Sequence, residues 1–252
     1  MIAAHKPYWM PEGACYLPVQ VGRALHSDNV LGFAGDDTGD NISTKNPCYC
    51  ELTALYWAWK NLAADYVGLV HYRRYFTRCE VHDVEARKHE ILTASEWESL
   101  LKAHPVIVPK KRRYYIETNR SHYNHAHHSD GLDCAEMYIR MAWPEYLPAF
   151  EKVMNRTWAH MFNMFIMRKD LLDDYCAWLF EILTIVETRV DITGWDAYES
   201  RICGFVSELL LDVWLEKNGI AYYEQNVSFL ESQNWLKKGG AFLKRKFLPR
   251  NM

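Results

Sequence analysis

The sequence predicts an α/β fold with an open, mostly parallel sheet flanked by helices and a helix-rich C-terminal half. Short apolar runs alternate with amphipathic helical stretches in the first half of the chain, and four helical stretches dominate the second half. Hydrophobic residues make up 49% of the 252 residues, which is enough for a sizeable core. With no internal repeat and no low-complexity linker, we expect a single domain over residues 1–232, followed by a tail over residues 233–252.

The first half is expected to supply most of the strands. Its predicted order is strand, extended segment, polar loop, helix, strand, helix and strand, at residues 2–4, 16–22, 35–47, 49–62, 66–70, 93–104 and 106–109. Apolar residues in the first of these helices recur at i, i+3, i+4 and i+7. In the second helix, Ser95 and Glu98 have the spacing of a capping box.

The second half is expected to be mainly helical. Helices are predicted around residues 132–141, 145–154, 169–186 and 196–218, with a strand at 164–167 between the second and third of them. In open α/β sheets, ligands bind beyond the carboxyl ends of the strands. The residues that directly follow the predicted strands are therefore the first candidates for a site.

Two predicted strands run directly into basic residues. The strand at 66–70 leads into Arg73 and Arg74, and the strand at 106–109 leads into the cluster at 110–113. Guanidinium groups pair bidentately with phosphate oxygens, so two such loops at one sheet edge suit a diphosphate. For residues 110–113 a solvated run of surface charge is the favoured alternative.

Two further features of the second half suggest chemistry. Four histidines, namely His122, His125, His127 and His128, fall within residues 121–130. Their spacing completes no known zinc pattern, so we favour contacts to sugar hydroxyls or phosphates over metal ligation. Glu208 lies on an otherwise apolar helix, where a buried carboxylate needs either a partner such as Arg201 or a functional reason. Both explanations of Glu208, a structural ion pair and a functional carboxylate, stay open.

The bulk composition narrows the classes of partner. The net charge of −3 gives no electrostatic argument for nucleic acid. The seven cysteines show no spacing typical of a disulfide framework, and the sequence has neither a signal-peptide pattern nor a long apolar run. We therefore expect a cytoplasmic protein whose cysteine thiols are reduced. Aromatic residues make up 14% of the chain, and such rings line many sugar sites, although an aromatic-rich core explains them equally well.

Several segments together resemble one family of bacterial proteins. They are Lys45-Asn46-Pro47, ELTALYWAWKN at 51–61, GLVHYRRYF at 68–76, NMFIM at 163–167 and GFVSE at 204–208. The sequence is similar to the formerly uncharacterised domain family encoded in capsule and O-antigen clusters, whose members are regarded as glycosyltransferases of GT-A-like fold. The resemblance extends from His5 to about Val227.

The resemblance implies transfer of a hexose from a nucleotide-sugar donor to a hydroxyl of a growing cell-surface polysaccharide. It favours UDP-linked galactofuranose or galactopyranose as donor and a glycan or lipid-linked oligosaccharide as acceptor. Residues 1–115 would then bind the nucleotide sugar and residues 116–232 the acceptor. The alternatives are a catalytically silent carbohydrate-binding or scaffold module of a synthesis complex, and a metal-dependent phosphate-ester hydrolase.

The resemblance leaves the need for a metal open. Typical GT-A enzymes carry an Asp-x-Asp motif at the end of a central strand, and this chain has His71-Tyr72-Arg73 there. Cations at this position would neutralise the leaving diphosphate directly. We therefore assign no metal ligands and no certain cofactor, although the carboxylates of the 35–47 loop keep Mn²⁺ or Mg²⁺ as candidates. The family also commonly has Arg after Glu208, where this chain has Leu209.

From these arguments we assign three groups of site residues. The general base is expected to be Glu208, with Asp133 as second choice. The donor is expected to contact His5, Lys6, Asp40, Asn41, Lys45, Asn46, His71, Tyr72, Arg73 and Arg74. The acceptor sugar is expected to contact His127, His128, Asp130, Asn163 and Arg201.

The tail combines apolar residues with six basic ones between residues 235 and 250. This pattern predicts a basic amphipathic helix that lies in the interface of an anionic membrane. The protein would then be attached peripherally to the inner face of the cell membrane, close to a lipid-linked acceptor. A solvated tail, or a helix packed on the main body, is the alternative.

Overall fold

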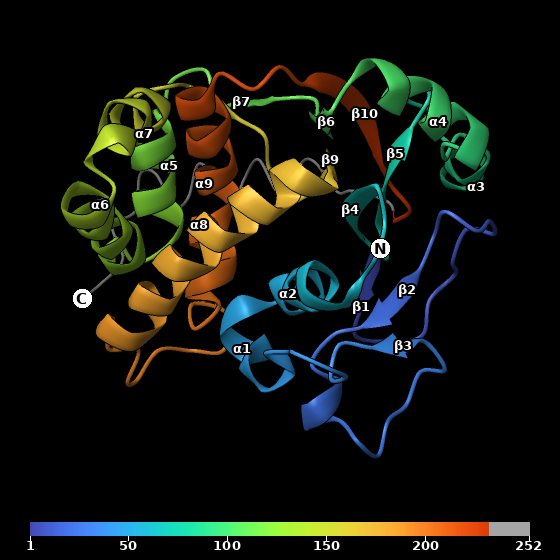
Figure 1. Cartoon of the computed structure of the whole chain (residues 1–252), viewed down its shortest axis with the longest axis horizontal. Helices are drawn as coiled ribbons and strands as arrows, with labels where there is room; N and C mark the ends of the chain where they lie inside the picture. The colour runs from blue at the N-terminus through green and yellow to red at the C-terminus, as the bar shows by residue number, and fades with distance from the viewer. Residues whose placement is uncertain (232–252) are drawn as a thin grey trace.

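The computed structural model describes residues 1–231, which form a mixed α/β fold. Figure 1 shows helices α5 to α9 gathered on one side of the molecule and most of the strands on the other. The helices are α1 (Asn46–Tyr49), α2 (Leu52–Asn61), α3 (Val84–His89), α4 (Ala94–Ala103), α5 (Asn119–Ala126), α6 (Asp130–Ala142), α7 (Leu147–Met154), α8 (Lys169–Arg189) and α9 (Ile202–Asn218).

Eight strands form the main sheet, in the order β3-β2-β1-β4-β5-β10-β6-β9. They are β1 (Ile2–Ala4), β2 (Pro18–Gln20), β3 (Ala34–Gly35), β4 (Tyr66–His71), β5 (Arg74–Thr77), β6 (Val106–Pro109), β9 (Phe165–Arg168) and β10 (Tyr223–Phe229). A separate two-stranded sheet joins β7 (Arg112–Arg113) and β8 (Trp158–Ala159).

The sheet is neither open nor mostly parallel, which corrects the expectation from sequence. Four of its eight strand pairings are antiparallel. Strand β9 pairs with both β4 and β6, so that β4, β5, β10, β6 and β9 close into a ring. Gly68 permits the close approach of β9, because a Cβ at this position would lie 2.6 Å from the Ile166 side chain.

The main error of the strand prediction lies in the segment His71-Tyr72-Arg73-Arg74-Tyr75-Phe76. We expected a loop there, but the chain turns at Tyr72 and Arg73 and returns as β5, with His71 opposite Arg74. Tyr75 and Phe76 are buried against the core. Strand β10, which the sequence did not predict, pairs with β5 and fixes the hairpin in place.

The N-terminal boundaries of other helices differ from the prediction because different residues cap them. The histidine segment expected to be a loop contains α5, whose N-cap Thr118 accepts a hydrogen bond from the Ser121 amide. Helix α9 begins at Ile202, because Asp196 instead caps a turn. The capping box of α4 uses Thr93 and Glu96, two residues before the expected pair.

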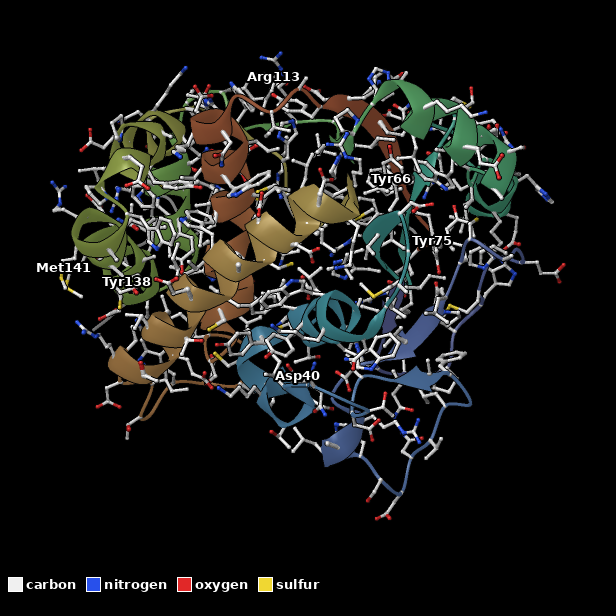
Figure 2. All side chains as sticks on the ribbon, viewed as in Figure 1. Asp40, Tyr66, Tyr75, Arg113, Tyr138 and Met141 are labelled. Atoms are coloured by element: carbon white, nitrogen blue, oxygen red, sulfur yellow. The ribbon has the colours of Figure 1, made fainter. Side chains whose placement is uncertain are left out.

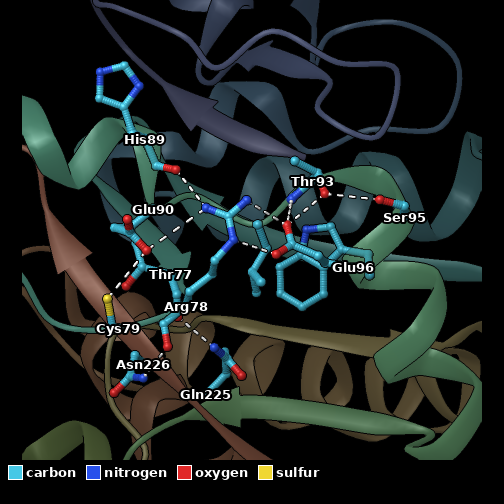
Figure 3. A network of polar contacts seen from close by, with 12 residues as sticks. Thr77, Arg78, Cys79, His89, Glu90, Thr93, Ser95, Glu96, Gln225 and Asn226 are labelled. Carbon is cyan, nitrogen blue, oxygen red and sulfur yellow. Dashed lines mark hydrogen bonds and ion pairs between the residues drawn. The ribbon is translucent and has the colours of Figure 1, made fainter.

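Polar contacts hold the end of β5 against α4 and β10. Arg78, which follows β5, forms a bidentate ion pair with Glu96 and also donates to the carbonyl of His89 at 2.6 Å. The side chain of Asn226 on β10 donates to the Arg78 carbonyl at 2.9 Å, as Figure 3 shows. The network connects this end of β5 to both neighbours.

Helix α9 lies among α6, α7 and α8, as Figure 1 shows, and is buried along most of its length. Its buried carboxylate Asp212 accepts hydrogen bonds from the backbone amide of His160 at 2.9 Å and from the His160 ring at 2.5 Å. Asp212 is thus satisfied within the protein. Among residues 1–231, no helix has the length and apolar character needed to cross a bilayer. The basic amphipathic tail predicted at 233–252 lies outside the described residues.

Candidate active site at the carboxyl edge of the sheet

A cavity of about 1500 Å³ opens where the carboxyl ends of several strands meet. Strands β1, β2 and β4 are mutually parallel, and β4 and β6 share a direction because both run antiparallel to β9. The residues at or directly after the ends of β1, β4 and β6, namely His5, His71 and Lys110, all line the cavity. Helices α1, α5 and α9 contribute the remaining walls. This is the position that the strand order predicts for a ligand site.

The cavity wall is strongly cationic. Arg73 and Arg74 from the β4–β5 turn, the basic residues 110–113 and Arg201 at the start of α9 all line it. The two basic segments expected to converge therefore border the same space. The guanidinium of Arg74 lies over the rings of both Phe162 and Phe229, at 4.6 and 5.2 Å from their centroids. Such a wall attracts an anion the size of a diphosphate.

Glu208 lies in this cavity without a protein partner. Among residues 1–231, none donates a hydrogen bond to its carboxylate or forms an ion pair with it, so the structural pair with Arg201 is not formed. Arg201 instead donates through Nε to the sulfur of Cys50 at 3.0 Å. Burial first, and the charge of Glu51 second, raise the pKa of Glu208 to about 7, although Arg74, Arg112 and Arg201 oppose the shift. A carboxyl with this pKa exchanges protons near neutral pH.

A second carboxylate, Glu51, faces the same cavity and is held from behind. The Asn163 side chain donates to Glu51 Oε1 at 2.7 Å and to the Gly204 carbonyl at 3.1 Å. Its Oδ1 accepts a hydrogen bond of 2.8 Å from the Ser207 hydroxyl. Gly204 allows this approach of α9, because a Cβ there would lie only 3.2 Å from the sulfur of Cys50. Asn163 therefore connects the segment before β9, the start of α2 and α9.

His71 completes the inner end of the cavity. Its Nε2 lies 2.7 Å from the Phe162 carbonyl and 3.6 Å from Glu51 Oε1. Burial lowers the pKa of His71, while the charge of Glu51 opposes the shift. A neutral ring that donates from Nε2 to the carbonyl leaves Nδ1 as a hydrogen-bond acceptor.

Backbone strain is concentrated around the cavity. Among residues 1–231, four residues other than glycine have positive φ: Cys50, Tyr115, Phe162 and Asn163. Cys50, Tyr115 and Phe162 line the cavity, and Asn163 holds Glu51. Each such conformation costs on the order of 1–3 kcal/mol and persists where the surroundings impose it, commonly at functional sites.

Only some of the residues assigned to the donor line the cavity. His5, Asn46, His71, Tyr72, Arg73 and Arg74 do so. Lys6 lies 5.7 Å from the Tyr72 ring without lining the cavity, while Lys45 forms an ion pair with Glu187 at 2.6 Å. Asp40 accepts from the Tyr56 hydroxyl and Asn41 caps a local turn. In Figure 2, Asp40 lies near α1 and far from Arg113, which borders the cavity.

Of the residues assigned to the acceptor, too, only some line the cavity. His127 and Arg201 line the cavity, and His127 stacks on Phe205 at 3.8 Å. Asn163 lies behind Glu51. His128 stacks on Trp195 outside the cavity, and Asp130 begins α6.

Asp133, the second choice for the base, is likewise not brought to the cavity. Its side chain is 53% exposed on α6 and pairs with Arg120 at 2.9 Å. The structure therefore places one of the two candidate bases, Glu208, among the cationic residues, and the other on the outer surface.

The acidic loop and the histidine segment both have other partners. Asp36 is buried and accepts hydrogen bonds from the amides of Gly22 and Arg23 and from the Ser43 hydroxyl. Buried Glu117 lies 2.9 Å from the Nδ1 atoms of both His122 and His125. Within residues 1–231, no three His, Cys, Asp or Glu side chains are grouped in a way that would hold a metal ion.

Sequence reasoning missed Glu51 and Glu117 as cavity residues. Glu51 opens the ELTALYW segment, and a charged residue next to an apolar helix is the same signal that drew attention to Glu208. Arg112 was considered as part of the 110–113 cluster but was not assigned to the site, because a solvated surface was the favoured interpretation of that cluster. Nothing local distinguishes Glu117 from other loop carboxylates.

Comparison with known proteins supports a family assignment. A model of the domain of unknown function DUF4422 matches residues 1–219. The curated proteins contain no significant match to the chain. Among solved structures, the apo form of WbbM, described as a bifunctional glycosyltransferase, aligns with a TM-score of 0.82 and 32% sequence identity. The alignment covers 92% of this chain but 45% of the WbbM chain, so this chain spans less than half of that protein.

The family match extends over most of the chain and includes every segment that carried the resemblance found from sequence. The likeness to WbbM, at the level of both fold and sequence identity, relates the chain to glycosyltransferases. The chain thus belongs to the DUF4422 domain family.

Proposed function

We propose that the protein is a glycosyltransferase that moves a hexose from a UDP-linked donor to a hydroxyl of a growing cell-surface polysaccharide. Support comes from the family match, from the likeness to WbbM and from a cavity large enough for a nucleotide sugar. The observation that carries the proposal is Glu208, a carboxyl that has no hydrogen-bond or ion-pair partner within residues 1–231 and whose pKa is raised to about 7 in a cavity lined by arginines. Galactofuranose and galactopyranose are the first sugars to test.

In this proposal, the cationic wall binds the donor diphosphate. Arg74 and Arg112 are two of the cations that act on Glu208, so a diphosphate bound by them would place the sugar close to that carboxyl. Charge develops on the leaving diphosphate as the glycosidic bond breaks, and fixed cations stabilise it without reorganising. His5 and Tyr72 border the same space.

Glu208 acts as the general base in this scheme. It accepts the proton of the acceptor hydroxyl while the oxygen attacks the anomeric carbon, and the bond to the diphosphate breaks. The raised pKa improves proton acceptance by the ionised carboxylate, because base strength follows pKa. Arg74 and Arg201 keep a sufficient fraction of Glu208 ionised near neutral pH.

A donor screen tests the proposal. The protein is incubated with UDP-galactofuranose, UDP-galactopyranose and UDP-glucose, and release of UDP is measured with and without polysaccharide acceptors. We expect one donor to release UDP faster than in a protein-free control. A catalytically silent carbohydrate-binding module would release none, and a phosphate-ester hydrolase would release phosphate from simple esters.

We further propose that the first half of the chain, up to about residue 115, binds the donor, that the second half, from there to residue 232, binds the acceptor, and that the protein works in the cytoplasm at the membrane surface. The basic composition of residues 233–252 supports this location. Flotation with anionic liposomes, comparing the full chain with one that ends at Ser232, tests the attachment. Equal flotation of both chains, or of neither, would contradict it.

A further inference from the structure

At the edge of the cavity, between β7 and α5, two adjacent hydrophobic side chains, Tyr115 and Ile116, are exposed to solvent. Tyr115 is 80% exposed and lines the cavity, and Ile116 beside it is 72% exposed. The neighbouring Arg112 and Arg113 are also exposed cavity residues. An exposed aromatic ring at the entrance of a polar cavity calls for a reason, because its exposure forgoes the free energy of burial.

The backbone at Tyr115 adopts a strained conformation that exposes the tyrosine side chain. Tyr115 has a φ of 60°, and the amide of Ile116 donates to the carbonyl of Tyr114 at 2.7 Å. This three-residue turn with positive φ is the rare and unfavourable form of the γ-turn. Glycine would adopt it without strain, so the tyrosine side chain is retained at a cost.

Both ends of the turn are fixed to the body of the protein. The amide of Tyr114 donates to the Thr157 carbonyl at 2.7 Å, and the Tyr114 ring is buried and stacks on His122 at 4.0 Å. On the other side, the amide of Asn119 donates to the Arg156 carbonyl at 2.7 Å. The ring of Tyr115 is therefore presented from a rigid base, which reduces the entropy lost on binding.

A second exposed tyrosine borders the same cavity. Tyr198, in the turn before α9, is 49% exposed; its ring contacts those of His127 and Phe205, with centroids 5.8 and 5.1 Å away, and the guanidinium of Arg201 lies 5.8 Å from its centroid. The part of the Tyr198 ring that stays exposed, together with Tyr115, suits a ligand that combines apolar C–H faces with many hydroxyls. A saccharide has this chemistry, because the C–H face of a sugar ring packs on an aromatic face while its hydroxyls bind water and polar groups.

We infer that Tyr115 and Tyr198 form an acceptor platform, on which sugar units of the acceptor glycan stack as its terminal hydroxyl approaches Glu208. The inference rests on the proposed transferase function and names the part of the site that receives the acceptor. The platform lies on the cavity that contains Glu208, so a glycan bound there reaches the reacting groups directly. Two tyrosines and one isoleucine form a patch too small for a protein interface.

An array of bacterial capsule and O-antigen oligosaccharides tests the platform through binding alone. We compare the full-length protein with Tyr115→Ala, Tyr115→Phe and, as a matched control, Tyr223→Ala, an exposed tyrosine of β10 that does not line the cavity. We expect binding of the wild type to one class of glycan, a loss of about tenfold in Tyr115→Ala, and retention in Tyr115→Phe and Tyr223→Ala. Equal binding of Tyr115→Ala and wild type, or no glycan bound by the wild type, would overturn the inference.

Two further measurements separate this inference from its alternatives. Calorimetry with UDP should give the same affinity in Tyr115→Ala as in the wild type, because the ring is assigned to the acceptor. Binding of Tyr115→Ala to vesicles of phosphatidylglycerol should also be unchanged. If the variant loses vesicle binding but keeps glycan binding on the array, Tyr115 and Ile116 contact a membrane instead of the acceptor. If glycan binding depends on Tyr115 but the protein turns over no UDP-sugar, the acceptor platform is retained and the proposed transferase function is rejected.

Discussion

Asn163 and Glu51, 112 positions apart in the sequence, are joined by a buried hydrogen bond of 2.7 Å. Asn163 makes this contact from a backbone with a φ of 51°, and it also holds Gly204 and Ser207 on α9. Two of the carboxylates that line the cavity, Glu51 and Glu208, therefore depend on one asparagine for their relative placement.

Asn163→Ala should lower the free energy of unfolding by about 1–3 kcal/mol, since it leaves buried polar partners unsatisfied. Urea unfolding followed by circular dichroism measures the change. The matched control is Asn155→Ala, which removes an exposed side chain that bonds only to the carbonyl four residues earlier. A loss no larger in Asn163→Ala than in the control would contradict the role of Asn163.

Glu51→Gln should move the pH dependence of turnover to lower pH. The charge of Glu51 helps to raise the pKa of Glu208 to about 7, and a base acts in its ionised form, so kcat/KM should rise with pH through about 7 in the wild type. Removal of that charge lowers the pKa of Glu208 and shifts the rising limb downwards. The control is Glu98→Gln on the exposed face of α4. An unmoved limb, or a shift to higher pH, would refute the coupling.

Glu208→Gln should stabilise the fold at alkaline pH. The folded pKa of about 7 lies above the ordinary value of 4.5, so the folded state binds the proton more tightly than the unfolded state. The wild type therefore loses stability relative to the variant as pH rises from 4.5 to 7, and above 7 the difference is constant at about 1–3 kcal/mol. Urea unfolding of both proteins at pH 5 and pH 8 tests this. An equal difference at the two pH values would be inconsistent with a carboxyl whose pKa is raised in the folded state.

Arg74→Ala should weaken the binding of UDP by about 1.5–3 kcal/mol if its hydrogen bonds to the diphosphate are direct. Arg73→Ala should have the smaller effect, because Arg73 already pairs with Glu231 at 3.1 Å. Calorimetry measures both, with Arg168→Ala as control, since Arg168 pairs with Asp170 away from the cavity. Unchanged affinity in both variants, with the fold intact, would remove the assignment.

The fold could be predicted from sequence where a pattern is local. Apolar runs at 2–4 and 66–70 became β1 and β4, and helical periodicity located α2, α8 and most of α9. The ring of strands could not be predicted, because it depends on β9 pairing with two strands at once. Pairing partners are distant in the chain, and no local residue pattern names them.

The candidate site shows the same division. Glu208 and the two basic segments were found because charge beside an apolar element is unusual and visible locally. Asp133 and Asp40 were assigned by similar reasoning, but the fold places both outside the cavity. Glu51 was missed because its importance comes from contacts with Asn163 and His71, which tertiary structure alone creates.

The turnover of Glu208→Gln tests whether Glu208 is the general base. UDP release from the active donor is measured for the wild type, Glu208→Gln and Asp133→Asn, with UDP affinity determined for each by calorimetry. The account predicts a fall of at least about 100-fold in Glu208→Gln with UDP affinity retained, and near-normal turnover in Asp133→Asn. Near-normal turnover in Glu208→Gln would contradict the account and return the role of base to Asp133 or a histidine.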